Sequence, residues 1–169
     1  IRQVLAPKKM PYIKRHKGVL PVPTGGSLKG TTLAFGDYGL RIKGDAVRLS
    51  AKLLKTTYEN LRRTLKPVKG CKIYMRVFPD IPVCIKGNET RMGKGKGSFE
   101  FWATRHVTIL PFCKTGRVIF EISGPGLRDE LAREALRQAA FRMPVAMEFI
   151  TRQTPPRLGR LFITPKGPV

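Results

Sequence analysis

Two strands are predicted at Cys71-Lys72-Ile73-Tyr74-Met75-Arg76-Val77-Phe78-Pro79-Asp80 and at Ser98-Phe99-Glu100-Phe101-Trp102-Ala103-Thr104, because both stretches are rich in aromatic and β-branched residues. Between them lies Thr90-Arg91-Met92-Gly93-Lys94-Gly95-Lys96-Gly97-Ser98, which combines high positive charge with little side-chain bulk. Its glycines let the backbone approach a polyanion closely, and each lysine can meet a phosphate. We therefore predict a sheet that carries a nucleic-acid-binding loop. The alternative is a solvated, flexible linker.

The charge of the whole chain favours the same class of partner. Its 169 residues include 33 Lys and Arg but only 11 Asp and Glu, which gives a formal net charge of +22. Self-repulsion of this size is tolerated best when a polyanion neutralises it. The sequence has no basic, Trp-rich amphipathic helix and no apolar run near about 18 residues, so no membrane partner is expected. RNA or DNA is favoured, and the length predicts one domain with extensions.

Neither an active site nor a cofactor site is predicted. The two histidines, Asp80 and the scattered glutamates form no pair with acid–base or metal-ligand spacing, so we expect no catalytic residue, metal, cofactor or small-molecule substrate. The segment Gly25–Thr32 resembles a phosphate-binding loop but has Thr31 where that loop requires lysine. The cysteines are odd in number and include no Cys-x-x-Cys pair, which predicts reduced, mostly buried thiols at Cys71, Cys84 and Cys113.

Both ends of the chain are predicted to be basic, extended arms. Residues 1–30 contain no acid and have four prolines that would interrupt a helix. We expect this arm to lie along a phosphate backbone, although a disordered tail is the alternative. Residues 152–169 also contain no acid and form the second, C-terminal basic arm, with Arg157, Arg160 and Lys166. The candidate RNA contacts of the first arm are Lys8, Lys9, Lys14, Arg15, His16 and Lys17.

The intervening residues 31–151 are predicted to form a single RNA-binding domain. In it, Thr31–Gly36 and Tyr38–Lys43 would form a hairpin with Arg41 and Lys43 on its polar face. A turn at Pro79–Pro82 would lead into a further short strand. That strand is expected at 83–86, others at 98–109, 117–123 and 145–151, and a connection at 110–116.

A first helix is predicted from the N-cap Ser50 to about Lys66, where Pro67 ends it. Its apolar stripe comprises Leu54, Tyr58, Leu61 and Leu65. A neighbouring basic stripe, offset by the single acid Glu59, comprises Lys52, Lys55, Arg62 and Lys66. This charge pattern predicts contact with phosphates, and an ordinary solvated face is the alternative.

A second helix is predicted over residues 127–142. Its apolar side comprises Leu131, Ala132, Ala135, Leu136, Ala139 and Met143, and its charged side comprises Glu130, Arg133, Glu134 and Arg137. Because that charged side mixes both signs, we interpret it as solvated surface. Strands and helices do not alternate regularly along the chain. The predicted fold class is therefore α+β, with two helices packed on a largely antiparallel sheet.

Five motifs follow one another in a recognisable order between about Pro7 and Thr151. They are Lys14-Arg15-His16-Lys17-Gly18, Phe35-Gly36-Asp37-Tyr38-Gly39-Leu40, Lys72-Ile73-Tyr74-Met75-Arg76-Val77-Phe78-Pro79-Asp80, Arg91-Met92-Gly93-Lys94-Gly95-Lys96-Gly97 and Glu130-Leu131-Ala132-Arg133-Glu134-Ala135. Together they closely resemble the bacterial-type "L-sixteen" family of large-subunit ribosomal proteins. The fourth motif is specific, so the resemblance does not depend on charge alone.

The resemblance implies a structural role without enzymatic activity. Members of that family bind large-subunit ribosomal RNA beside the elbow of the aminoacyl-site transfer RNA, among other large-subunit proteins, and support subunit assembly and tRNA accommodation. By this likeness Arg91, Met92, Lys94 and Lys96 would form the functional tip, and Gly93, Gly95 and Gly97 would allow close approach. Arg76, in the third motif, joins the candidate RNA contacts.

Some features depart from the bacterial pattern. The segment Thr104–Cys113 resembles an insertion, the tail after Thr151 is longer, and the chain opens with Ile1. These departures indicate a mitochondrial member that acts in the mitochondrial ribosome of the matrix, with bacterial cytoplasm or chloroplast as the alternative. A free RNA- or DNA-binding module outside any ribosome is the alternative function, since charge alone supports it equally.

Overall fold

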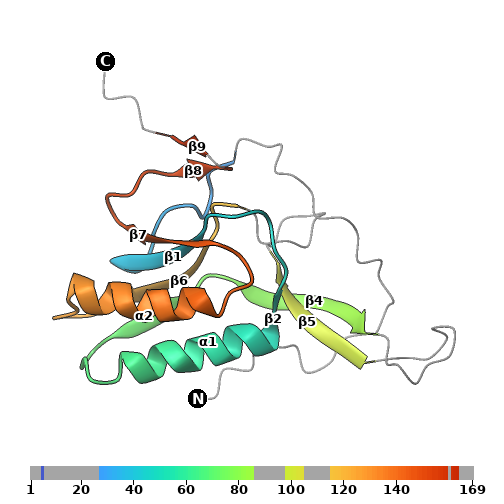
Figure 1. Cartoon of the computed structure of the whole chain (residues 1–169), viewed down its shortest axis with the longest axis horizontal. Helices are drawn as coiled ribbons and strands as arrows, with labels where there is room; N and C mark the ends of the chain where they lie inside the picture. The colour runs from blue at the N-terminus through green and yellow to red at the C-terminus, as the bar shows by residue number, and fades with distance from the viewer. Residues whose placement is uncertain (1–4, 6–26, 86–97, 105–114, 160, 164–169) are drawn as a thin grey trace, which may run out of the picture.

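The computed structural model describes residues 5, 27–85, 98–104, 115–159 and 161–163, and it confirms an α+β fold (Figure 1). The helices are α1 (Ala51–Thr64) and α2 (Asp129–Phe141). The strands are β1 (Tyr38–Ile42), β2 (Leu49–Ser50), β3 (Lys72–Met75), β4 (Phe78–Ile85), β5 (Ser98–Thr104), β6 (Val118–Ser123), β7 (Met147–Thr151), β8 (Arg157–Leu158) and β9 (Leu161–Phe162).

The main sheet has the strand order β3-β6-β1-β7, and every neighbouring pair in it is antiparallel. Helices α1 and α2 run side by side along one face of this sheet, and the β8–β9 hairpin lies beyond the other (Figure 1). Because side chains alternate along a strand, Leu40 points to the helices and Arg41 points away from them. The sheet therefore has an apolar, helix-covered face and a helix-free face that carries charge.

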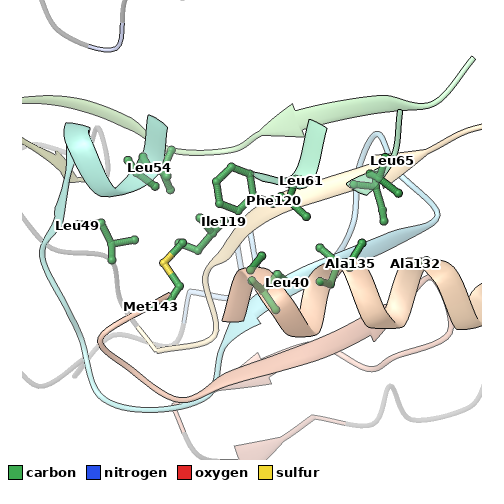
Figure 2. Close-up of a cluster of buried hydrophobic side chains, with 14 of the residues drawn as sticks. Leu40, Leu49, Leu54, Leu61, Leu65, Ile119, Phe120, Ala132, Ala135 and Met143 are labelled. Atoms are coloured by element: carbon green, nitrogen blue, oxygen red, sulfur yellow. The ribbon is translucent and has the colours of Figure 1, made fainter. Parts of the chain in front are cut away.

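The hydrophobic core lies between the two helices and the main sheet. Figure 2 shows Phe120 of β6 and Leu40 of β1 among leucines of α1 and alanines of α2. Phe120 and Leu61 are fully buried, and Leu40 is 2% exposed. The small alanines at the predicted spacing on α2 let that helix pack closely on the sheet. The predicted apolar stripes of both helices are thereby confirmed, with Tyr58 and Leu131 only half-buried.

Helix α1 begins where the sequence predicts. The side-chain oxygen of Ser50 accepts a hydrogen bond from the Leu53 amide at 3.3 Å, which satisfies one of the free amides of the first turn. The helix ends at Thr64, two residues before the expected end at Lys66. Helix α2 carries Asp129 and Glu130 in its first turn, where the helix dipole favours acids.

A second sheet has the strand order β2-β5-β4. Here the predicted turn at Pro79–Pro82 is wrong, because β4 runs through these residues to Ile85. The register of the β4–β5 pairing shifts between Pro79 and Ile81. Strand β4 also lies at the edge of its sheet, where prolines are tolerated because one side of the strand forms no backbone hydrogen bonds with a neighbour. Ile85 pairs with Ser98, so the two strands that flank residues 86–97 are held together. The glycine–lysine loop itself lies outside the described residues.

The first half of the predicted hairpin, Thr31–Gly36, is not a strand. Instead, the backbone amides of Ala34, Phe35 and Gly36 donate hydrogen bonds to the carboxylate of Glu121 on β6, the shortest being 2.7 Å from Phe35. These amides therefore donate to a buried carboxylate and not to the carbonyl groups of a neighbouring strand. A side chain at Gly36 would put its Cβ 2.8 Å from the Ile122 carbonyl oxygen, so this close approach requires glycine.

The C-terminal segment also differs from the extended arm expected from its composition. Strands β8 and β9 pair, with Arg157 opposite Phe162, and Arg157 is only 5% exposed. The expectation that Arg157 belongs to an extended basic arm is therefore wrong, because it is buried beside an acid. The N-terminal arm, the extension of β5 to Ile109 and most of the predicted connection at 110–116 lie outside the described residues, as do Arg160 and Lys166.

Candidate nucleic-acid interface

The exposed face of α1 carries a row of basic side chains. The predicted cations Lys52, Lys55, Arg62 and Lys66 are all exposed. Glu59 is the only acid within the helix. Among the described residues, none of these four cations takes part in an ion pair. Their charge is therefore available to a polyanion.

Two arginines of the neighbouring helix α2, unlike the cations of α1, form ion pairs with acids. Arg133 forms an ion pair with Asp129 at 3.0 Å, and Arg137 forms one with Glu134 at 3.9 Å. Arg133 also lies over the Phe149 ring, 4.6 Å from its centroid. These arginines already have partners on their own helix, so the prediction of a mixed, solvated surface on α2 agrees with the geometry.

Two further exposed cations extend the α1 surface beyond the predicted set, Arg63 in the last turn of α1 and Lys69 after the helix. Lys72, which opens β3, is also exposed, but it lies on the helix-free side of the sheet. These cations were not predicted because the prediction was restricted to one stripe of the first helix, and they lie outside that stripe or after the helix. The remaining predicted surface cation, Lys43, is exposed directly after β1, and its amide bonds the Ala146 carbonyl at 2.9 Å.

Arg41 does not lie on an exposed polar face, and that prediction is wrong. Its side chain is fully buried, and its Nε and Nη2 each donate a hydrogen bond to Oε2 of Glu148 at 3.2 Å. Its Nη1 donates to the carbonyl oxygens of Thr31 at 2.8 Å and Pro155 at 3.0 Å. Burial lowers the pKa of Arg41, whereas the charge of Glu148 acts in the opposite direction. Arg41 is thus a structural cation and not an RNA contact.

Glu148 serves two buried arginines at once. Arg157 donates from Nη1 to the same carboxylate oxygen at 2.7 Å, and from Nε to the Gly159 carbonyl at 2.9 Å. We call Arg41, Glu148 and Arg157 the arginine triad. It joins β1, β7 and the β8–β9 hairpin on the helix-free face. This triad explains why part of the C-terminal segment packs against the domain.

Arg76 is also engaged within the protein. Its Nη1 forms an ion pair with Oε1 of the fully buried Glu121, and its side chain is 17% exposed. Burial acts to raise the pKa of Glu121, but hydrogen bonds from Phe35, Gly36 and Ala34 together with the charge of Arg76 outweigh it, so the pKa lies below its usual value. The predicted role of Arg76 as an RNA contact is therefore limited by its pairing with Glu121.

Replacing Glu121 with glutamine is expected to destabilise the fold by about 1–3 kcal/mol at neutral pH, because a neutral amide holds the three backbone donors and Arg76 less strongly. The lowered pKa means that ionised Glu121 stabilises the folded state fully above the unfolded pKa of about 4.3. This contribution is lost as pH falls through the lower, folded pKa. Urea unfolding between neutral and acid pH should show the wild type and the Gln variant converging towards acid. The exposed Glu130→Gln is the control, and a constant gap between Glu121→Gln and wild type at all pH values would contradict this assignment.

Other kinds of site are not evident in the described residues. No group of three or more His, Cys, Asp or Glu there could hold a metal ion, and neither described helix has the length and apolar character of a membrane span. Cys71 is free and half-buried, and burial raises the pKa of its thiol, which keeps it protonated. The Cys113 position and the Cys84 side chain fall outside the described part.

Comparison with known proteins decides the family. The sequence matches the family described as ribosomal protein L16p/L10e over residues 7–150. The chain belongs to this family. The matched range covers all of α1, α2 and the main sheet up to Ile150 of β7, so the L16p/L10e assignment applies to the folded domain that carries the α1 surface. It agrees with the resemblance drawn from the five motifs.

Two relatives support the L16p/L10e assignment at high identity. One is the large ribosomal subunit protein uL16m of Schizosaccharomyces pombe, 51% identical over 158 residues that span 94% of this chain and 70% of that protein. Another is the large ribosomal subunit protein uL16m of Neurospora crassa, 42% identical over 146 residues, 86% of this chain and 55% of that protein. The chain thus spans 70% and 55% of the length of these two relatives.

Proposed function

We propose that this chain is a structural constituent of the large subunit of the mitochondrial ribosome, where the exposed cations of α1 bind the phosphate backbone of ribosomal RNA. The observation that carries this proposal is the row Lys52, Lys55, Arg62 and Lys66, exposed and without ion pairs in the described residues, on a helix of an L16p/L10e family domain. The names of the two fungal relatives support the ribosomal and mitochondrial assignment. The protein needs no enzymatic activity for this role.

Contacts between these cations and RNA phosphates would fix the position of the protein on the RNA without recognising the nucleotide sequence. Lysine meets a phosphate as a point charge, and a helix presents such charges at a constant spacing, so α1 follows a phosphate backbone without contacting base edges. We further propose that the glycine–lysine residues 91–97 approach the aminoacyl-site tRNA, and that the N-terminal arm contacts ribosomal RNA. These two proposals rest on the sequence motifs and net charge.

Replacing Lys52, Lys55, Arg62 and Lys66 together with alanine is expected to weaken RNA binding and reduce its salt dependence. Each lost phosphate contact lowers the magnitude of the slope of log K against log salt by about 0.7–0.9, so the combined change is about 3. Binding of the purified chain to a fragment of large-subunit RNA over a salt series measures this slope. A second variant, Arg133→Ala with Arg137→Ala, is the matched control, because both arginines have acidic partners.

The outcomes separate the proposals clearly. An unchanged slope in the α1 variant, with helicity retained by circular dichroism, would show that α1 does not contact the RNA.

Co-sedimentation distinguishes the ribosomal role from a free RNA- or DNA-binding module. The chain should remain with large subunits in high salt at one copy per particle, whereas release into the free pool would support the module.

A further inference from the structure

The helix-free face of the main sheet carries a stacked aromatic pair, of which Phe35 is exposed and Tyr74 is half-buried, that the α1 interface does not explain. Phe35 is 59% exposed, and its ring stacks on Tyr74 of β3 with centroids 5.5 Å apart and an interplanar angle of 28°. The guanidinium carbon of Arg76 lies 5.1 Å from the Phe35 centroid. Tyr74 and Arg76 are two residues apart, so both lie on the same side of the chain, beneath Phe35. We call Phe35 and Tyr74 the aromatic platform.

The platform is held firmly by the backbone beneath it. The Phe35 amide donates to Oε2 of Glu121 at 2.7 Å, and the Gly36 amide donates to the same oxygen at 2.8 Å. One residue further, the Asp37 amide bonds the Ile122 carbonyl at 3.0 Å. A large apolar ring on such a fixed backbone, more than half exposed, loses little conformational freedom when it acquires a partner.

The charges around the platform select the partner. Lys72 is exposed two residues before Tyr74 on the same side of β3. Arg152 donates from Nε to the Gly36 carbonyl at 3.3 Å and is 67% exposed, although it also pairs with Asp37 at 3.0 Å. Cations beside exposed rings suit a nucleotide, because the ring stacks on the base and the cations meet its phosphates. An apolar protein partner would gain nothing from these charges.

We propose that Phe35 and Tyr74 form a stacking site for one unpaired nucleobase of ribosomal RNA, with Lys72 beside it for a flanking phosphate. This inference rests on the proposed function, which it extends from backbone contact to contact with a base. The site lies on the face of the sheet opposite α1. The protein would therefore hold two separate RNA segments, one along the helix and one at the platform.

The other exposed aromatic residues are weaker candidates. Phe141 is 78% exposed at the end of α2 and has Arg137 at 5.7 Å, but no second ring among the described side chains stacks on it. Phe162 is 51% exposed, but two arginines lie over its ring, and no second ring of the described residues stacks on it. Phe141 is therefore a suitable matched control, since it combines exposure and a neighbouring arginine without a stacked ring partner.

The decisive test uses the protein in its assembled particle. Phe35→p-benzoylphenylalanine places a photoreactive ring at the platform, and large subunits that contain this variant at normal occupancy are irradiated. We expect a cross-link from residue 35 to ribosomal RNA at a nucleotide that is unpaired. A cross-link to a neighbouring protein instead, or none to RNA in fully occupied particles, would overturn the stacking site while leaving the α1 interface untouched.

A binding experiment with the full chain isolates the base from the phosphates. Phe35→Leu retains the backbone hydrogen bonds to Glu121 but removes the aromatic face. Its affinity for a single-stranded RNA oligonucleotide should fall about 5- to 100-fold, because one base–aromatic stack is lost. Its affinity for an abasic oligonucleotide of equal length should not change. Phe141→Leu should bind both oligonucleotides as the wild type does, and Phe35→Tyr should restore binding.

The same measurements distinguish failure of the stacking site from failure of the proposed function. Equal loss of affinity for both oligonucleotides, or no loss for either, would overturn the stacking site although RNA binding persists. A wild-type chain that binds neither oligonucleotide at low salt would overturn the proposed function itself. Circular dichroism of each variant confirms that the comparison is between folded proteins.

Discussion

Replacing Glu148 with alanine is expected to lower the free energy of unfolding by about 3–5 kcal/mol, because it leaves buried guanidinium groups without their counter-charge. Arg41 is fully buried, and the Arg157 side chain is 6% exposed, so both guanidinium groups depend on Glu148 as a partner in place of bulk water. Both arginines donate to the single oxygen Oε2 of Glu148. One substitution therefore removes the partner of two charges.

The effect should depend on unpaired charge and not on lost volume. A triple variant, Arg41→Met with Glu148→Leu and Arg157→Met, removes all three charges and keeps most of the packing. It should be more stable than Glu148→Ala, since apolar replacement of a whole buried ion network costs little. Urea unfolding followed by circular dichroism measures both. If Glu148→Ala unfolded at the wild-type midpoint, the arginine triad would not stabilise the fold.

Phe120→Ala should have an effect of similar size, about 3–5 kcal/mol, by opening a cavity in the core. Phe120 is fully buried on the helix side of β6, between the leucines of α1 and the alanines of α2 (Figure 2). Because the same ring supports both helices, the surrounding side chains cannot collapse into the space without moving a helix. The substitution would therefore weaken the packing that holds α1 in place without removing any of its cations.

The control for Phe120→Ala is Phe141→Ala, which removes the same ring from a site that is 78% exposed and should change stability by less than about 0.5 kcal/mol. Chemical unfolding of the purified chain gives both values. RNA binding below the unfolding transition should keep the wild-type salt slope in the Phe120 variant, since no cation has been removed. Similar destabilisation by the two substitutions would mean that Phe120 does not occupy the centre of the core.

The helices were predictable because their signals are local. Ser50 caps α1, and leucines at helical spacing mark its buried side, so the position of its cations on a neighbouring stripe follows from 3.6 residues per turn. Pro79 and Pro82 misled the prediction, because a proline signals a turn unless its strand lies at a sheet edge. That position in the sheet depends on β5 and β2, which lie elsewhere in the sequence.

The large positive charge, the two amphipathic helices and the family motifs could all be predicted, since composition, spacing and residue order require no knowledge of contacts. Which cations remain available to RNA depends instead on the folded arrangement of the chain. Arg41 and Glu148 are 107 residues apart, and Glu121 lies 85 to 87 residues from the three amides that it binds. A charged side chain is stable in the interior only beside its partner, and such partners meet only when the chain folds. The same folding brought Phe35 over Tyr74 and left Lys52 and Lys55 facing outward.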